Sequence, residues 1–175
     1  MSLEGNSYAI LYAIKRFGSI PGKKALQKIM YFANLKTQMY SFQWNKFGPY
    51  SEELKYALDD YILEELIDVT PIDLLTIDRR QFNMKLSSRG LDLAQSLTLD
   101  DITKASVDFA YEVLREKNPR EMELLASTHY IMKYNDRETN ADYVYEILSK
   151  LKPYAGFTRT EVAGSIQELK NLQLV

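Results

Sequence analysis

The chain contains one histidine, His129, the residue type that most often transfers protons near neutral pH. A catalytic or metal-binding histidine needs a partner that orients its ring, and none is evident around the apolar helical segment that holds His129. The neighbouring carboxylates Asp59 and Asp60 would diverge by about 100° on a helix instead of converging. We therefore interpret His129 as a packed core residue.

Motifs with an established chemical mechanism are also missing. The sequence has no P-loop, dinucleotide-binding fingerprint, nucleophile elbow, HExxH zinc motif or cysteine. We expect no catalytic residues, no metal and no cofactor, so the chain is predicted not to be an enzyme. An enzyme whose site is assembled from residues far apart in the sequence stays open as the third alternative.

Aromatic side chains are abundant, with 13 tyrosines and one tryptophan. Large amphipathic rings often anchor protein interfaces, although most of the rings between residues 40 and 50 could equally hold that loop on the core. We predict a face on which basic groups attract an acidic protein partner and aromatic rings anchor it. Its residues are Lys24, Lys28, Tyr31, Trp44 and Tyr50.

Charge is unevenly distributed along the chain. Residues 5–50 contain seven basic and no acidic side chains, whereas residues 51–78 contain nine acidic side chains and one basic one, Lys55. Such a division can mark an interaction face, but we favour the interpretation that the two segments neutralise each other. The net charge of −2 lacks the strong positive field of many nucleic-acid-binding proteins.

The N-terminal half predicts three helices. Asn6 or Ser7 can cap the first, which Gly18 stops, and a second follows within residues 19–36. After a turn at Gly48-Pro49, Ser51 can cap a third helix. Its first turn then carries Glu52 and Glu53, which the helix dipole favours.

A β-hairpin and further helices are predicted after the third helix. One strand begins near residue 67 and ends at Pro71, and the other alternates apolar and polar residues around Met84. The remaining helix-start signals predict five more helices. The predicted starts are Ser87 or Ser88, residue 99, Pro119 after Asn118, Thr139, and a capping box of Thr158 with Glu161. The helix that begins at residue 99 is predicted to end near residue 117.

Two stretches, ALQKIMYFAN and FGPYSEELKYAL, resemble the core signature of Panacea-type domains, and the YwgA-like family of uncharacterised proteins is similar. The residues that carry the likeness lie within residues 22–66: Lys24, Leu26, Gln27, Lys28, Tyr31, Phe32, Phe47, Gly48, Pro49, Tyr50, Ser51 and Leu54. Panacea-type domains are winged-helix-like modules of antitoxins and of a related proteolysis adaptor. The resemblance implies regulation by binding, with an antitoxin-like role among the alternatives.

A typical winged helix inserts the helix before its hairpin into the major groove of DNA. Here that helix is rich in carboxylates, which repel phosphates. A DNA-binding transcriptional regulator is therefore the second alternative. It would contact phosphates through Lys23, Lys24, Lys28, Arg79 and Arg80.

The predicted fold class is α+β, mainly α. Residues 1–97 are expected to form a winged-helix-like unit with a small β-hairpin, and residues 98–175 a helical part packed on it. The lack of cysteine is compatible with a reducing cytoplasm, and no apolar run is long enough to cross a membrane. Whether the chain forms a homodimer stays open.

Overall fold

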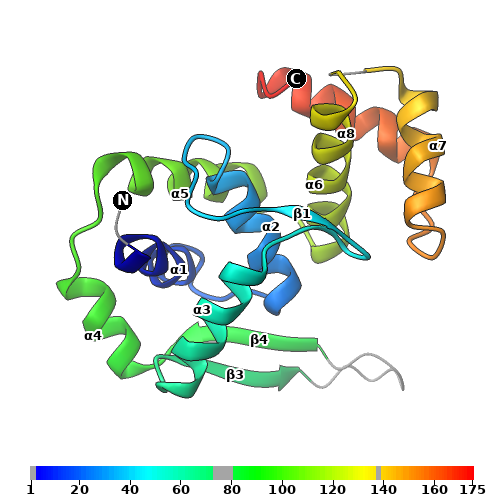
Figure 1. Cartoon of the computed structure of the whole chain (residues 1–175). Coiled ribbons are helices and arrows are strands. Elements are labelled where there is room, and N and C mark those ends of the chain that lie inside the picture. The colour runs from blue at the N-terminus through cyan, green and yellow to red at the C-terminus, as the bar shows by residue number, and fades with distance from the viewer. Residues whose placement is uncertain (1–2, 73–80, 137–138) are drawn as a thin grey trace. The chain divides into compact units, whose positions relative to one another are not determined.

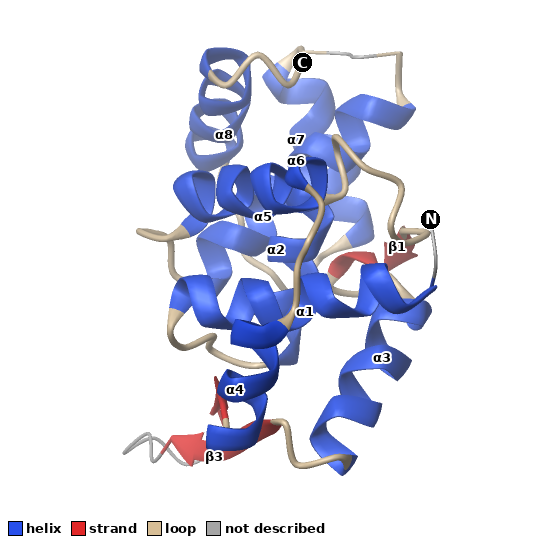
Figure 2. Ribbon diagram, turned by 90° about the vertical axis from the view of Figure 1, so that its left-hand side faces the viewer, coloured by secondary structure: helices blue, strands red, loops and turns tan. Residues whose placement is uncertain are grey.

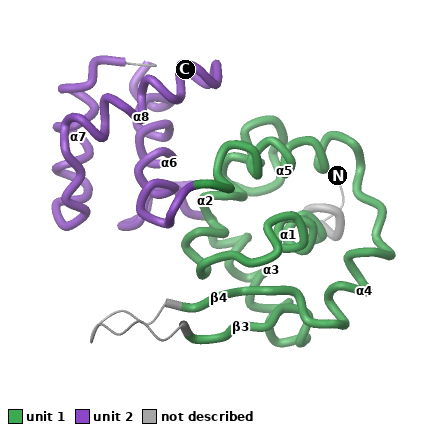
Figure 3. The backbone as a smooth tube through the Cα atoms, turned by 180° about the vertical axis from the view of Figure 1, so that it is seen from behind, with its two compact units in different colours: residues 1–42, 51–116 green, residues 43–50, 117–175 purple. Residues whose placement is uncertain are grey.

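The computed structural model describes residues 3–72, 81–136 and 139–175 (Figure 1). Helices make up most of the described chain and the strands are short, which confirms the predicted α+β, mainly helical class (Figure 2). The chain divides into two compact units (Figure 3). Unit 1 is Met1–Phe42 with Ser51–Glu116, and unit 2 is Gln43–Tyr50 with Lys117–Val175.

Unit 1 has the predicted order of three helices, a hairpin and a further helix, followed by one more helix. Its elements are α1 (Leu3–Phe17), α2 (Lys23–Ala33), α3 (Glu52–Leu63), β3 (Ile67–Ile72), β4 (Gln81–Leu86), α4 (Ser88–Ser96) and α5 (Asp101–Leu114). The first helix begins at Leu3, so the cap predicted at Asn6 or Ser7 is wrong. It ends before Gly18, whose φ of 71° is one that glycine adopts without strain.

The start of α3 confirms the prediction made for Ser51. The Ser51 hydroxyl oxygen accepts a hydrogen bond of 3.3 Å from the Leu54 backbone amide, and Glu52 and Glu53 occupy the first turn. The Gln27 side chain bonds the Ser51 backbone twice, at 2.9 Å each, so α2 fixes the start of α3.

The hairpin of β3 and β4 is antiparallel, with Ile67 opposite Leu86. Pro71 pairs with Phe82 inside β3, so it does not end that strand as predicted. Ile20 adds an unpredicted bridge, since its amide and carbonyl both bond Met84 at 2.9 Å. Ser87 caps α4, as one of the two predicted candidates.

Helix α5 packs with α1 and α2 and so belongs to unit 1. The Arg16 guanidinium bonds the Asp108 carboxylate at 2.9 Å and stacks 3.8 Å from the centre of the Tyr111 ring. The first unit therefore extends to Glu116, where residue 97 was expected, and it excludes residues 43–50.

Unit 2 contains β1 (Gln43–Asn45), β2 (Gly48–Tyr50), α6 (Pro119–Tyr134), α7 (Ala141–Leu151) and α8 (Arg159–Asn171). Pro119 opens α6 and the capping box of Thr158 with Glu161 opens α8, both as predicted. The cap of α7 is Asn140, next to the predicted Thr139. Across the described ranges, no helix combines the length and the apolar character that a membrane span requires.

Candidate protein-binding surface

The structure removes two residues from the partner-binding face predicted on α2. Lys28 is 2% exposed and Tyr31 is 3% exposed, because every residue from Ala25 to Ala33 of α2 is buried. The Tyr31 ring packs edge-on against Phe42, with 5.3 Å between centroids. Neither side chain can steer or anchor a partner from these positions.

The structure also limits which of the basic residues predicted to contact DNA could reach it. Lys24 is exposed, as expected, but Lys28 is buried. The Lys23 ammonium lies 2.6 Å from the Asp59 carboxylate of α3, which partly neutralises it. Arg79 and Arg80 lie outside the described residues. Of the predicted phosphate contacts in the described ranges, Lys23 and Lys24 are thus the exposed ones.

Trp44 and Tyr50, the other two predicted partner-binding residues, belong to unit 2 and are half-buried. The Trp44 ring centroid lies 5.6 Å from that of Tyr130, which lies 4.5 Å from that of Tyr134. We call these three rings the aromatic surface. Tyr134, at its outer end, is 60% exposed.

Gly48 brings the β1–β2 hairpin against α6. Its φ is 88°, and a Cβ atom at this position would lie 2.5 Å from the Ser127 hydroxyl oxygen of α6. Trp44 pairs with Pro49 across the hairpin, next to Gly48. The glycine therefore lets the hairpin approach α6 closely, which positions the Trp44 ring beside Tyr130.

A buried ion pair supports the same part of unit 2. The Lys152 ammonium binds the Glu123 carboxylate of α6, and its side chain is almost fully buried. The same nitrogen lies 5.8 Å from the centroid of the Trp44 ring. A cation at this distance is attracted to the ring face, so Lys152 links α6, the end of α7 and Trp44.

The aromatic surface is suited to binding. Burial raises the pKa of Tyr130, as does the neighbouring Tyr134. On the adjacent position of α6, the exposed Lys133 ammonium lies 5.5 Å from the Tyr134 ring centroid. The rings offer contact area, and the lysine adds a positive charge beside them.

Sequence reasoning found Trp44 but missed Tyr130 and Tyr134. Their spacing of four residues on a predicted helix places both rings on one face, which is a signal that was present in the sequence. Their pairing with Trp44 had no such signal, because it joins segments about 90 positions apart.

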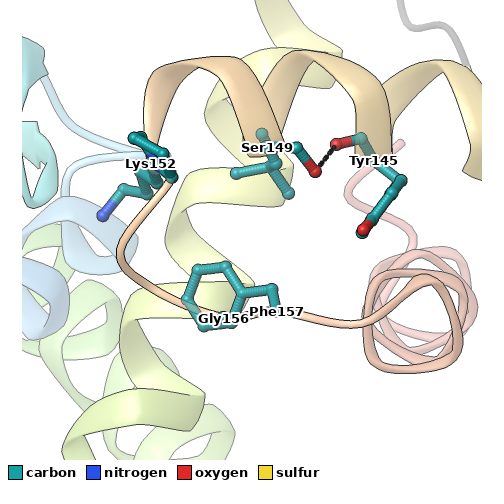
Figure 4. Close-up of a pocket in the computed structure, with 7 residues that line it drawn as sticks. Tyr145, Ser149, Lys152, Gly156 and Phe157 are labelled. Atoms are coloured by element: carbon teal, nitrogen blue, oxygen red, sulfur yellow. Dashed lines mark hydrogen bonds between the residues drawn. The ribbon is translucent and has the colours of Figure 1, made fainter.

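One cavity of the described structure lies within unit 2. A cavity of about 150 Å³ lies between the end of α7 and the loop before α8, smaller than ordinary ligand sites of about 300–1,000 Å³. In Figure 4 the Lys152 chain runs away from Ser149 and Tyr145, and the Ser149 hydroxyl donates to the Tyr145 carbonyl oxygen at 2.8 Å. His129 is buried, as predicted, and no group of three metal-binding side chains occurs in the described ranges.

Comparison with other proteins leaves the family resemblance as a prediction. The chain matches no protein-family model, and no curated protein matches it.

Proposed function

We propose that the chain is a non-enzymatic regulatory module that captures an acidic protein partner on the aromatic surface. The continuous series of rings from Trp44 through Tyr130 to Tyr134 is the observation that carries this proposal. We place the module in the cytoplasm and keep an antitoxin-like role, as the resemblance to Panacea-type domains implies.

The rings suit an interface because tyrosine and tryptophan bury much area while losing little side-chain freedom. The inner ring is already held by the hairpin and by Lys152, which reduces the entropy lost on binding. The basic groups that attract the partner are reassigned from α2 to the exposed Lys133 and Lys46.

DNA binding by a winged-helix-like unit 1 stays the alternative, and the described residues weaken it. Glu52, Glu53, Asp60 and Glu64 are exposed along α3, where a winged helix would meet phosphates. Lys23 is engaged with Asp59, and Lys28 is buried.

Affinity capture from a native extract, scored for protein and nucleic acid, tests the proposal. The informative variant combines Tyr134→Ala with Lys133→Glu. Its matched control combines Tyr154→Ala with Lys150→Glu, an exposed tyrosine and an exposed lysine of unit 2 that are not part of the aromatic surface. We expect a protein that the control and the original chain retain and the first variant loses. Equal retention by both variants would contradict the proposal, and recovery of nucleic acid alone would favour the alternative.

A further inference from the structure

One side of α3 carries two large side chains that are exposed in the described structure. Tyr56 is 60% exposed and Leu63 is 80% exposed. They are seven residues apart, which is two helical turns, so they lie along the same side of the helix. The opposite side buries Leu54, Leu58 and Tyr61, so α3 is already packed on its core through other residues.

Carboxylates line the same exposed side. Glu52 and Asp60 stand four residues before and after Tyr56, which completes a strip of Glu52, Tyr56, Asp60 and Leu63. We call this the α3 strip. Two other acids of the helix have local roles, since Glu53 accepts a bond of 3.0 Å from the Ser41 amide and Asp59 binds Lys23. The acids of the strip are paired more weakly. The Glu52 carboxylate lies 3.9 Å from the Lys55 ammonium, and no ion pair with Asp60 is found among the described residues.

Lys55 indicates which chemistry the strip accepts. Its ammonium lies 4.5 Å from the centroid of the Tyr56 ring and 3.9 Å from the Glu52 carboxylate. One cation is thus held by a ring and a carboxylate together. An incoming lysine or arginine could use the same combination at Tyr56 and Asp60, while Leu63 offers an apolar contact.

We propose that the α3 strip docks a cationic amphipathic helix of a partner protein. Side chains at intervals of four, four and three residues match the spacing by which two helices pack side by side. The alternating acids select basic residues in the partner and repel DNA. A second copy of the strip would place like charges together, which disfavours self-association through this face.

This site is distinct from the aromatic surface in unit and in charge preference. The aromatic surface belongs to unit 2 and stands beside Lys133, whereas the strip belongs to unit 1 and is acidic. An experiment that contradicts one of the two proposals therefore leaves the other unaffected.

The test titrates the full chain with a labelled peptide of about 14 lysine and leucine residues, four helical turns, arranged to place leucines on one face. A scrambled peptide of the same composition controls for charge alone. We expect the ordered peptide to shift the backbone amide NMR signals of residues 52–64 and to bind at least about tenfold more tightly than the scrambled one.

Variants locate the site. Tyr56→Ala with Leu63→Ala should weaken the ordered peptide about tenfold or more, whereas the matched pair Ile102→Ala with Tyr154→Ala, also exposed, should leave it unchanged. All these side chains are exposed, so folding should be preserved, which amide spectra will show. Equal binding of both peptides, equal loss in both variant pairs, or shifts confined to other elements would overturn the proposal.

Discussion

The ring of Trp44 in β1 lies 5.6 Å, between centroids, from the ring of Tyr130 in α6. Through this contact, residues 43–50 pack with α6 although the chain on both sides of them belongs to unit 1. The stretch NKFGPYSEELKYAL, residues 45–58, is therefore divided between the two units. Its turn serves the aromatic surface of unit 2, and its acidic residues begin α3 of unit 1.

Replacing Gly48 should destabilise unit 2. In Gly48→Ala the new methyl group would meet the Ser127 hydroxyl, and alanine would have to adopt a φ of 88°. Steric overlap and backbone strain together should lower the free energy of unfolding by about 2–4 kcal/mol. Urea unfolding followed by the fluorescence of Trp44, the single tryptophan, measures the change.

Gly164→Ala is the control, because the Cβ position there has no neighbour within 4 Å. It lies inside α8, so alanine should raise stability by about 0.5–1 kcal/mol. If Gly48→Ala changed the free energy of unfolding by the same amount as this control, the close approach of the hairpin to α6 would be refuted.

Breaking the buried ion pair should cost stability even though the pair itself adds little. Lys152→Met removes the cation and leaves the Glu123 carboxylate, which is partly exposed, without its partner. We expect a loss of about 1–3 kcal/mol, below the ~3–5 kcal/mol typical of fully buried pairs. Adding Glu123→Leu to Lys152→Met should recover part of the lost stability. If the stability loss of the double variant equalled the sum of the losses of the two single variants, the two residues would not be coupled.

The Arg120–Glu161 ion pair, together with the capping box of α8, should make the stability of unit 2 depend on acid pH. Hydrogen bonds from Arg120, and next from the Thr158 backbone, lower the pKa of Glu161 from its ordinary 4.5 to about 2. A folded-state pKa below the unfolded value means that the stabilisation is complete above about pH 4.5 and is lost as pH falls toward 2.

Thermal unfolding of the original chain and of Glu161→Gln across this range checks the sign. The stability difference between them should shrink steadily as pH falls from 5 to about 2. A constant difference would mean that the charge of Glu161 does not contribute.

Local signals in the sequence predicted much of the fold, and contacts between distant segments explain what they missed. Ser51 and Thr158 were predictable because a cap bonds an amide only three positions away. The burial of Lys28 was not, since helical periodicity gives the faces of a helix and says nothing of what covers each face. The bridge between Ile20 and Met84 likewise joins positions too far apart to leave a local pattern.

For the candidate surface, the sequence supplied Trp44 and the Gly48-Pro49 turn. The reason for Gly48, a hydroxyl of α6 at the position of its missing Cβ, required the packed structure. The acidic character predicted for α3 is confirmed, because Glu52, Asp60 and Glu64 are exposed.

The most direct test of the binding proposal is the dissociation constant of the captured protein for the original chain and for Tyr134→Ala, measured by isothermal titration. Tyr134 is the outermost ring of the aromatic surface, so its removal should not disturb folding. An exposed ring that a partner covers as a main contact should contribute at least ~2 kcal/mol, so we predict binding about 30-fold weaker. A dissociation constant for Tyr134→Ala within about twofold of that of the original chain would contradict the assignment of this surface.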